Sequence, residues 1–142
     1  MGRVMFNILK LLFLLLTTIT FNAFGFDSNE EKMEFCKSIT EVIQKQLPMK
    51  VDQVTTLNSV ICTPTNPPTF IYDFIFGVDS TGDLAKEVKD SVATNSKKQL
   101  NIWCSSPDKK MIIDDFKVQI DTKDINGVFL DSLKLDINNC KK

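Results

Sequence analysis

The sequence contains no histidine, and its one arginine, Arg3, lies within the first ten residues. Histidine is the usual general base of nucleophilic triads and the commonest metal ligand. Arginine supplies the planar group that grips phosphate or carboxylate with two hydrogen bonds. These absences exclude most familiar hydrolases and zinc enzymes, and we expect neither a cofactor nor a metal ion. They do not exclude catalysis by a pair of carboxylates.

The apolar run near the N-terminus is too short to cross a bilayer, which takes roughly 20 residues. The run "LLFLLL" (11–16) follows Arg3 and Lys10 and precedes the small residues of "AFG" (23–25). A charged start, a short apolar core and a small-residue cleavage site form an export signal. We therefore predict a signal peptide over 1–25 and a single domain over 26–142. The protein is expected to be periplasmic or secreted, without stable membrane insertion.

The predicted exported chain lacks a basic patch. Removal of Arg3 and Lys10 leaves 15 basic and 18 acidic residues, so the net charge becomes −3. The lysines are scattered along the chain. Such a chain has no electrostatic footprint for nucleic acid or anionic lipid, and we expect no nucleic-acid partner.

Four cysteines lie in the predicted exported part: Cys36, Cys62, Cys104 and Cys140. No Cys-x-x-Cys motif occurs, so neither a thiol-redox site nor a zinc knuckle is indicated. An even cysteine count in an exported chain predicts disulfides, here two, with three possible connectivities. The chain also lacks an Asn-x-Ser/Thr sequon, which favours a bacterial source.

Two stretches have helical spacing of apolar residues. Ser28 and Glu31 form a capping box, and Pro48 disfavours helical geometry in the residue before it, so we predict a helix over 28–47. A second helix is predicted from 82 to about 94. The helical spacing continues towards Cys104, and the sequence does not decide whether the helix extends that far.

Four stretches alternate in the manner of strands: 51–61, 70–78, 112–121 and 129–137. In the stretch 51–61, Leu57 and Val60 are expected on opposite faces. In the stretch 129–137, Phe129 and Leu133 are expected on the same face. "DING" (124–127) predicts a hairpin turn with glycine at a positive φ. The resulting order is αββαββ. We predict an α+β fold with two helices packed on one face of a four-stranded antiparallel sheet.

Asp73 and Asp114 are the weak catalytic candidates, because each interrupts an otherwise apolar face. If the two hairpins abut, these carboxylates approach each other, and burial would raise their pKa values. Such a pair could act as acid and base in a hydrolase. The alternative is that each aspartate lies near a sheet edge and reaches water. The adjacent Asp114 and Asp115 point to opposite faces of a strand and form no pair.

An acidic stretch at 79–90 resembles a calcium loop only in part. Asp79, Thr81 and Asp83 stand at alternate positions and Asp90 at the twelfth. Leu84 occupies the place of the glycine that makes the sharp turn, and aspartate replaces the bidentate glutamate. Helix capping explains the cluster better.

The strand at 70–78 is apolar on both sides. Its aromatic side holds Phe70, Tyr72, Phe74 and Phe76. No basic residues flank these rings, so they do not indicate a single-stranded nucleic-acid site, and we expect them to pack under the helices. Ile71 and Ile75 then face away from the helices, where a partner or a second copy would cover them. They are the predicted binding residues.

Several motifs resemble those of a family of small exported bacterial proteins. They are the Leu-Pro-Met-x-Val-Asp stretch from Leu47 to Asp52, followed by Thr55 to Leu57, the Asp124-x-x-Gly127 turn and Cys140. A Cys-x-x-Pro motif matches Cys104 to Pro107. The family brings no reaction with it, so no catalytic residue is carried over.

The resemblance also implies a disulfide pairing. Cys104 and Cys140 belong to the shared pattern, whereas Cys36 and Cys62 are additional in this chain, which implies the pairs Cys104–Cys140 and Cys36–Cys62. Our leading hypothesis is an exported, non-enzymatic module that binds a protein or a small apolar ligand, or associates with itself. The alternative is a secreted effector or hydrolase that uses a carboxylate pair.

Overall fold

The structure, a computed structural model, describes residues 25–83 and 85–140; of residues 108, 110 and 111 it describes the backbone. The predicted signal peptide lies outside the described residues, apart from Gly25. The described elements follow one another in this order: α2 (Asn29–Gln44), β1 (Met49–Lys50), β2 (Thr55–Thr63), β3 (Thr69–Phe76), α3 (Ala85–Ser105), α4 (Pro107–Asp115), β4 (Lys117–Lys123) and β5 (Phe129–Leu135).

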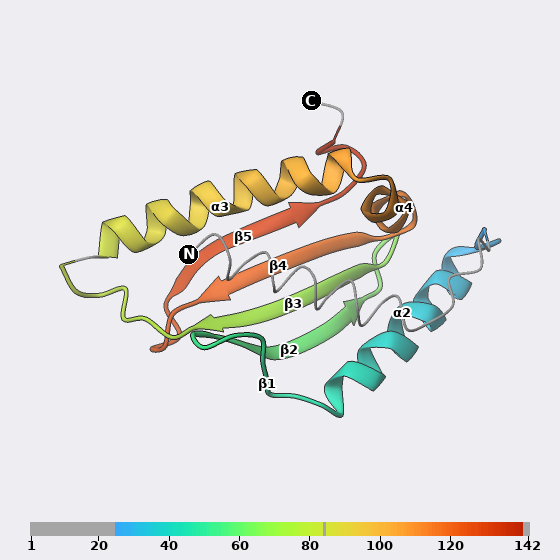
Figure 1. Ribbon diagram of the computed structural model, residues 1–142. Coiled ribbons are helices and arrows are strands. Elements are labelled where there is room, and N and C mark those ends of the chain that lie inside the picture. Colours follow the sequence, from blue (N-terminus) through green and yellow to red (C-terminus); the bar gives the residue numbers. More distant parts are fainter. Residues whose placement is uncertain (1–24, 84, 141–142) are drawn as a thin grey trace.

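The five strands form one sheet in the order β1-β2-β3-β4-β5 (Figure 1). The α+β class predicted from the sequence is confirmed, but the sheet differs in two respects. It has an additional short strand, β1, at its edge beside β2. It is also mixed, because β3 and β4 pair in parallel while the other neighbouring strands are antiparallel.

The parallel pairing follows from the connection between β3 and β4. Helices α3 and α4 lie between these strands in the chain and return it to the end of the sheet where β3 began. The register then runs from Thr69 opposite Lys117 to Ile75 opposite Lys123. A crossover of this kind makes the second strand parallel, whereas a short turn would make it antiparallel.

Helix α4 replaces the first part of the strand predicted at 112–121. Pro107 begins the helix, a position where its missing N–H costs nothing. Ile112 and Ile113 are buried, and Asp114 is exposed. Ile112 and Phe116 are four residues apart, a spacing that fits one face of a helix as well as one face of a strand. The apolar pattern therefore could not distinguish the two.

The other two helices also differ from the predictions in their bounds. Ser28 caps α2 by accepting a hydrogen bond from the Glu31 amide at 3.2 Å. The helix ends at Gln44, so the predicted end at residue 47 is one turn too late. Helix α3 continues to Ser105 and includes Cys104, which resolves the extension that the sequence left open.

Two irregularities change which side chains face the helices. A register shift between Leu57 and Ser59 places both Leu57 and Val60 on the buried side of β2, so their predicted separation is wrong. A shift between Thr122 and Lys123 pairs Phe129 with Lys123, and Phe129 is 55% exposed. The prediction that Phe129 shares a face with Leu133 is therefore wrong as well. An extra residue in one strand reverses the alternation that follows it.

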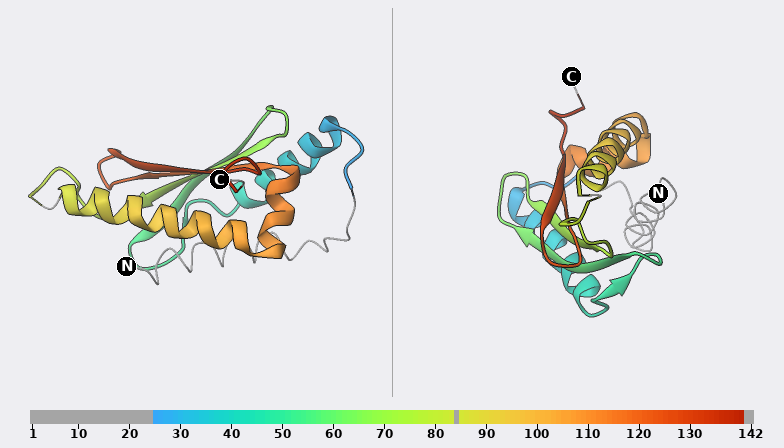
Figure 2. Two further views of the ribbon diagram at one scale, coloured as in Figure 1. Left: turned by 90° about the horizontal axis from the view of Figure 1, so that it is seen from above. Right: turned by 90° about the vertical axis from the view of Figure 1, so that its left-hand side faces the viewer.

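The helices cover one face of the sheet, which we call the helix face. Figure 2 shows α3 and α4 on the same side of the strands, with α2 at the β2 end. The aromatic residues of β3 are buried there, together with Trp103 of α3 and Ile39 and Ile43 of α2. Burial of Tyr72 raises the pKa of its hydroxyl.

Two disulfides tie the helices to the sheet and to the C-terminal segment. Cys36 of α2 is bonded to Cys62 of β2, and Cys104 of α3 is bonded to Cys140. This is the pairing that the family resemblance implies. The described cysteines include no free thiol.

The stretch between α2 and β2 is a structural corner. The carboxylate of Asp52 accepts hydrogen bonds from the amides of Val54 and Thr55, both at 2.8 Å. These bonds hold the turn from β1 into β2, where Met49 pairs with Leu57. The residues after Pro48 therefore have a structural role in this fold.

Candidate functional site

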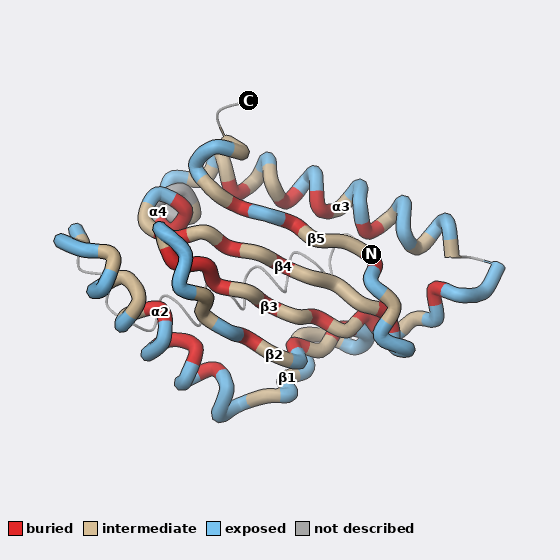
Figure 3. Tube along the Cα trace, turned by 180° about the vertical axis from the view of Figure 1, so that it is seen from behind, coloured by how far each residue is buried: buried red, intermediate tan, exposed pale blue. Residues whose placement is uncertain are grey.

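The candidate site is the face of the sheet opposite the helices, which we call the open face. Among the described residues no helix lies over it, and Figure 3 shows strands β2 to β5 uncovered from that side. The cross-strand pairs assign these residues to the open face: Thr56, Ser59, Ile61, Thr63, Thr69, Ile71, Asp73, Ile75, Lys117, Gln119, Asp121, Lys123, Phe129, Ser132 and Lys134.

The open face is organised in rows that cross the strands. Directly paired residues point to the same side of a sheet, so each register position defines one row. Four rows result: Thr56–Ile75–Lys123–Phe129, Ser59–Asp73–Asp121–Ser132, Ile61–Ile71–Gln119–Lys134, and Thr63–Thr69–Lys117.

Apolar side chains border the central polar row on both sides. Ile71 and Ile75 are partly buried on β3, as the sequence placed them, away from the aromatic residues. Ile61, beside Ile71, is 46% exposed, and Phe129 is more exposed still. Neighbouring apolar side chains that stay in contact with water are one mark of a surface that binds another molecule.

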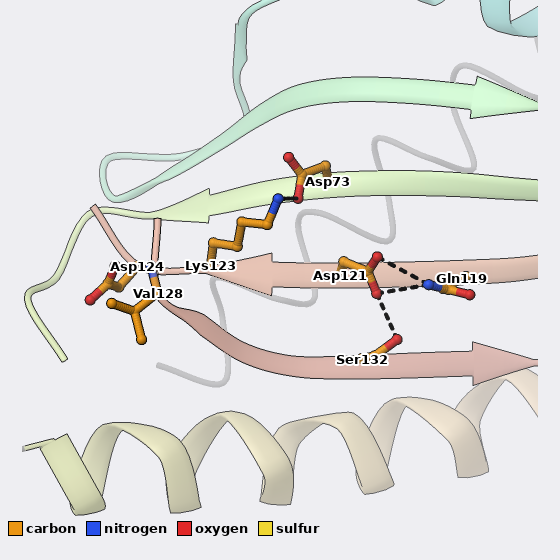
Figure 4. Close-up of polar contacts among 7 residues, drawn as sticks. All are labelled: Asp73, Gln119, Asp121, Lys123, Asp124, Val128 and Ser132. Carbon is orange, nitrogen blue, oxygen red and sulfur yellow. Dashed lines mark hydrogen bonds and ion pairs between the residues drawn. The ribbon is translucent and has the colours of Figure 1, made fainter. Parts of the chain in front are cut away.

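The polar row holds two aspartates in register on neighbouring parallel strands. Asp73 forms an ion pair with Lys123, with Nζ 3.2 Å from Oδ1. Asp121 accepts hydrogen bonds from the Gln119 amide at 3.0 and 3.1 Å and from the Ser132 hydroxyl at 2.6 Å. Figure 4 shows these side chains together on β3, β4 and β5. Both carboxylates are thus bound internally.

The structure does not bring the two predicted catalytic aspartates together. Asp73 lies in the middle of β3 on the open face, whereas Asp114 is exposed on α4. The prediction that they approach each other required a strand at 112–115, where the chain is helical. The carboxylate that stands beside Asp73 is Asp121.

Asp124 is the most thoroughly bound carboxylate among the described residues. It lies in the turn after β4 and is fully buried. Its oxygens accept hydrogen bonds from the amide and hydroxyl of Ser80 and from the amides of Asn126 and Val128. Burial alone would raise the pKa of Asp124, but these hydrogen bonds outweigh it and lower the pKa to about 2. This carboxylate joins the loop after β3 to the turn after β4.

The predicted turn itself is confirmed. Gly127 has φ +81°, a conformation that other residues rarely adopt, and its amide donates to the Asp124 carbonyl at 3.1 Å. Asp124 to Gly127 therefore have a structural role in this fold.

The acidic stretch that resembles a calcium loop is occupied by local bonds. The carboxylate of Asp79 accepts from the Thr81 amide at 2.8 Å and from the Thr81 hydroxyl at 2.5 Å, and these bonds lower its pKa. Within 25–83 and 85–140, no three His, Cys, Asp or Glu side chains gather closely enough to hold a metal ion.

Among the described residues, no helix is both long enough and apolar enough to pass through a lipid bilayer.

Comparison with known proteins finds likeness in structure alone. No family model matches the chain, and no curated protein sequence matches it. A crystal structure of a protein described as secreted, from Pseudomonas aeruginosa, superposes with a TM-score of 0.60 at 7% identity, covering 82% of this chain and 99% of that one. EpsS, the pilotin of the Vibrio vulnificus type 2 secretion system, superposes with a TM-score of 0.56 at 10% identity, covering 80% of this chain and 96% of that one. At such low identity these likenesses show a shared fold.

Sequence reasoning found Ile71, Ile75 and Asp73 but not the residues beside them. Asp121, Lys123 and Gln119 looked like the ordinary polar side of an alternating strand. Their position beside Asp73 depends on the parallel pairing of β3 with β4, which local sequence patterns do not predict.

Proposed function

We propose that the protein is an exported, non-enzymatic binding module that holds a protein partner on its open face. The observation that carries this proposal is the distribution of apolar side chains on β3. Its aromatic side is sealed by the helices, whereas Ile71 and Ile75 remain on a face that no described element covers. Covering apolar surface is the main favourable term in most protein–protein association.

The arrangement of the open face fits a protein partner. Rows that each contain two apolar side chains lie on either side of the row that holds Asp73 and Asp121. A mixture of apolar anchors and pre-arranged polar groups is typical of protein interfaces. An uncovered sheet face offers a broad contact area, whereas small-molecule sites are concave. We therefore favour a protein over a small apolar ligand.

Export is the second part of the proposal. The first 25 residues have the order of an export signal, and both disulfides are closed, which suits an oxidising compartment such as the periplasm or the exterior. N-terminal sequencing of protein recovered from the periplasm or the medium should find a start close to Phe26. An intact Met1 on exported protein would contradict the proposed signal peptide.

The structural likenesses are compatible with this proposal at the level of fold. The same architecture occurs in a protein described as secreted and in a pilotin of a secretion system. Folds carry many functions, so this is an analogy and assigns no partner. The surface of this particular chain has to carry the argument.

Hydrolysis by a carboxylate pair is the weaker proposal. Asp73 and Asp114 lie on different elements and do not face each other. Asp73 and Asp121 are neighbours, with Lys123 paired to Oδ1 of Asp73 and with Gln119 and Ser132 donating to Asp121. They lie on an uncovered sheet face, whereas sites that bind small-molecule substrates are concave.

The test replaces Ile71 and Ile75 with lysine in the protein purified after export. Candidate partners are identified beforehand by cross-linking in the native host and purified individually. We expect the double variant to fold, with a modest loss of stability, and to lose partner binding. The matched control is Val42→Lys/Ile137→Lys, two exposed apolar residues outside the open face.

One outcome would contradict the proposal. A folded Ile71→Lys/Ile75→Lys variant that binds its partners as tightly as the parent removes the open face as the binding surface. If that variant does not fold, Ile71→Ser/Ile75→Ser serves instead, because serine is small and can be accommodated at a partly buried position.

A further inference from the structure

The charged groups of the open face differ in whether the protein itself already binds them. Both aspartates are engaged, Asp73 by Lys123 and Asp121 by the Gln119 amide and the Ser132 hydroxyl. Lys117 and Lys134 take part in no ion pair with any described residue. The charges left for a partner on this face are therefore ammonium groups.

The two unpaired lysines lie close together at the β4–β5 end of the row that contains Ile61 and Ile71. Lys134 pairs directly with Gln119, and Lys117 is two residues before Gln119 on β4, so the lysines are diagonal neighbours on the open face. The carboxylate of Asp136, the next acidic group along the chain, accepts a hydrogen bond from the Asn139 amide at 2.8 Å. Lys134 completes the row that contains Ile61 and Ile71.

The remainder of the molecule has the opposite balance of charge. The open face carries three lysines and two aspartates, whereas residues 26–142 as a whole carry 15 basic and 18 acidic residues. Helix α2 begins with Glu30 and Glu31. Acidic residues thus prevail away from the open face, and the sheet presents an excess of positive charge.

We propose that the partner offers this face an acidic segment, with one or more carboxylates for Lys117 and Lys134 and an apolar side chain for Ile61 and Ile71. The inference rests on the proposed binding function and adds the chemistry of the partner to it. Complementary charge fixes the orientation of a partner and excludes partners of the wrong sign, even where each ion pair contributes little affinity.

A second copy of this chain is a poorer occupant. In a symmetric dimer formed face to face, each subunit presents the same surface to the other. Both surfaces would bring an excess of lysine, and neither would bring free carboxylates. Charge complementarity therefore favours a different chain.

The experiment measures binding of three synthetic peptides to the protein purified after export. Each peptide has eight residues in which leucine alternates with glutamate, lysine or glutamine. At low ionic strength we expect the glutamate peptide to bind about tenfold more tightly than the lysine peptide, with the glutamine peptide between them. The preference should weaken in 0.5 M salt, where charges are screened within a few ångströms.

Charge reversal locates the effect. Lys117→Glu/Lys134→Glu should invert the preference so that the lysine peptide binds more tightly. The matched control is Lys97→Glu/Lys98→Glu, which makes the same change at exposed positions of α3. It should leave the order of the three peptides as it is in the parent.

The outcomes separate this inference from the proposed function. Equal binding of the three peptides, or a preference for lysine, with all binding lost in the uncharged variant Ile71→Ser/Ile75→Ser, overturns the acidic partner and keeps the open face. Binding of all peptides that survives Ile71→Ser/Ile75→Ser overturns the open face itself. Self-association that Lys117→Glu/Lys134→Glu abolishes would identify a second copy as the occupant and would also overturn the inference.

Discussion

Both faces of β3 carry apolar side chains, but their surroundings are opposite. On the helix face, Phe70, Tyr72, Phe74 and Phe76 are each at most 8% exposed. On the open face, Ile71 and Ile75 stand on either side of Asp73, and all three are partly in contact with water. One strand therefore supplies the core with one set of side chains and a candidate interface with the other.

Apolar residues on the two sides of a strand have different roles when the sheet is covered on one side only. A strand buried on both faces reads as continuously apolar. Here the helices pack against the aromatic residues, whereas no described helix lies over the isoleucines. Asp73 marks the difference, since a carboxylate in the middle of a sealed face would lose its hydration.

The largest expected effect is on the helix face and comes from its two disulfides. The bridges close loops of 26 and 36 residues, and on the chain-entropy model each should contribute about 3–4 kcal/mol. Cys36→Ala/Cys62→Ala should free α2 from β2, and Cys104→Ala/Cys140→Ala should free the C-terminal segment from α3. Urea denaturation with and without reductant measures both losses. An unchanged midpoint after complete reduction would contradict this prediction.

Truncation of neighbouring residues tests the two faces directly. Phe74→Ala should reduce the free energy of unfolding by about 3–5 kcal/mol, because it opens a cavity in the core. Ile75→Ala should reduce it by only about 1 kcal/mol, because this side chain is already partly hydrated. Equal losses in urea denaturation would show that the open face is as well packed as the helix face, and the comparison would fail.

Acid titration tests the junction that Asp124 forms between the loop after β3 and the turn after β4. The folded-state pKa of Asp124 is about 2, below the ordinary value of 3.8, so its ionised form stabilises the fold. This contribution is complete above about pH 4 and is lost as the pH falls towards 2.

Asp124→Asn should lower stability at neutral pH and flatten the dependence between pH 4 and pH 2. Denaturant midpoints measured from pH 2 to pH 7 report both effects. Asp79→Asn is the matched control, since the carboxylate of Asp79 accepts hydrogen bonds from the amide and hydroxyl of Thr81, which is only two residues away in the same loop. A larger effect from Asp79→Asn than from Asp124→Asn would argue against the role of Asp124 as a junction.

The smallest expected effect concerns the ion pair on the open face. The side chain of Lys123 is 41% exposed and that of Asp73 is 17% exposed, so solvent screens their attraction. A double-mutant cycle with Asp73→Asn and Lys123→Met should give a coupling of about 0.2–1 kcal/mol that decreases with salt. The pair Lys32–Asp115, 3.5 Å apart, provides a second cycle outside the open face. A coupling of several kcal/mol would mean that the open face is sealed from water.

The candidate site was predictable only along single strands. Alternation in 70–78 was enough to place Ile71 and Ile75 opposite the aromatic residues, because successive side chains of a strand point to opposite faces. Asp121 and Lys123 could not be placed beside Asp73 in this way. Their proximity to Asp73 depends on how β4 pairs with β3, and pairing is a property of the sheet.

The sequence by itself determined the local structure and the chemistry available. Ser28 and Pro48 predicted the ends of the first helix to within a turn, and Gly127 predicted the hairpin turn. The absence of histidine excluded the commonest general base. Only the tertiary structure decided that α4 is helical, that β3 and β4 are parallel, and that two bulges reverse the faces of Val60 and Phe129. The reason is physical: caps, turns and alternation depend on neighbours in the chain, whereas strand direction and register depend on contacts between segments that are far apart in sequence.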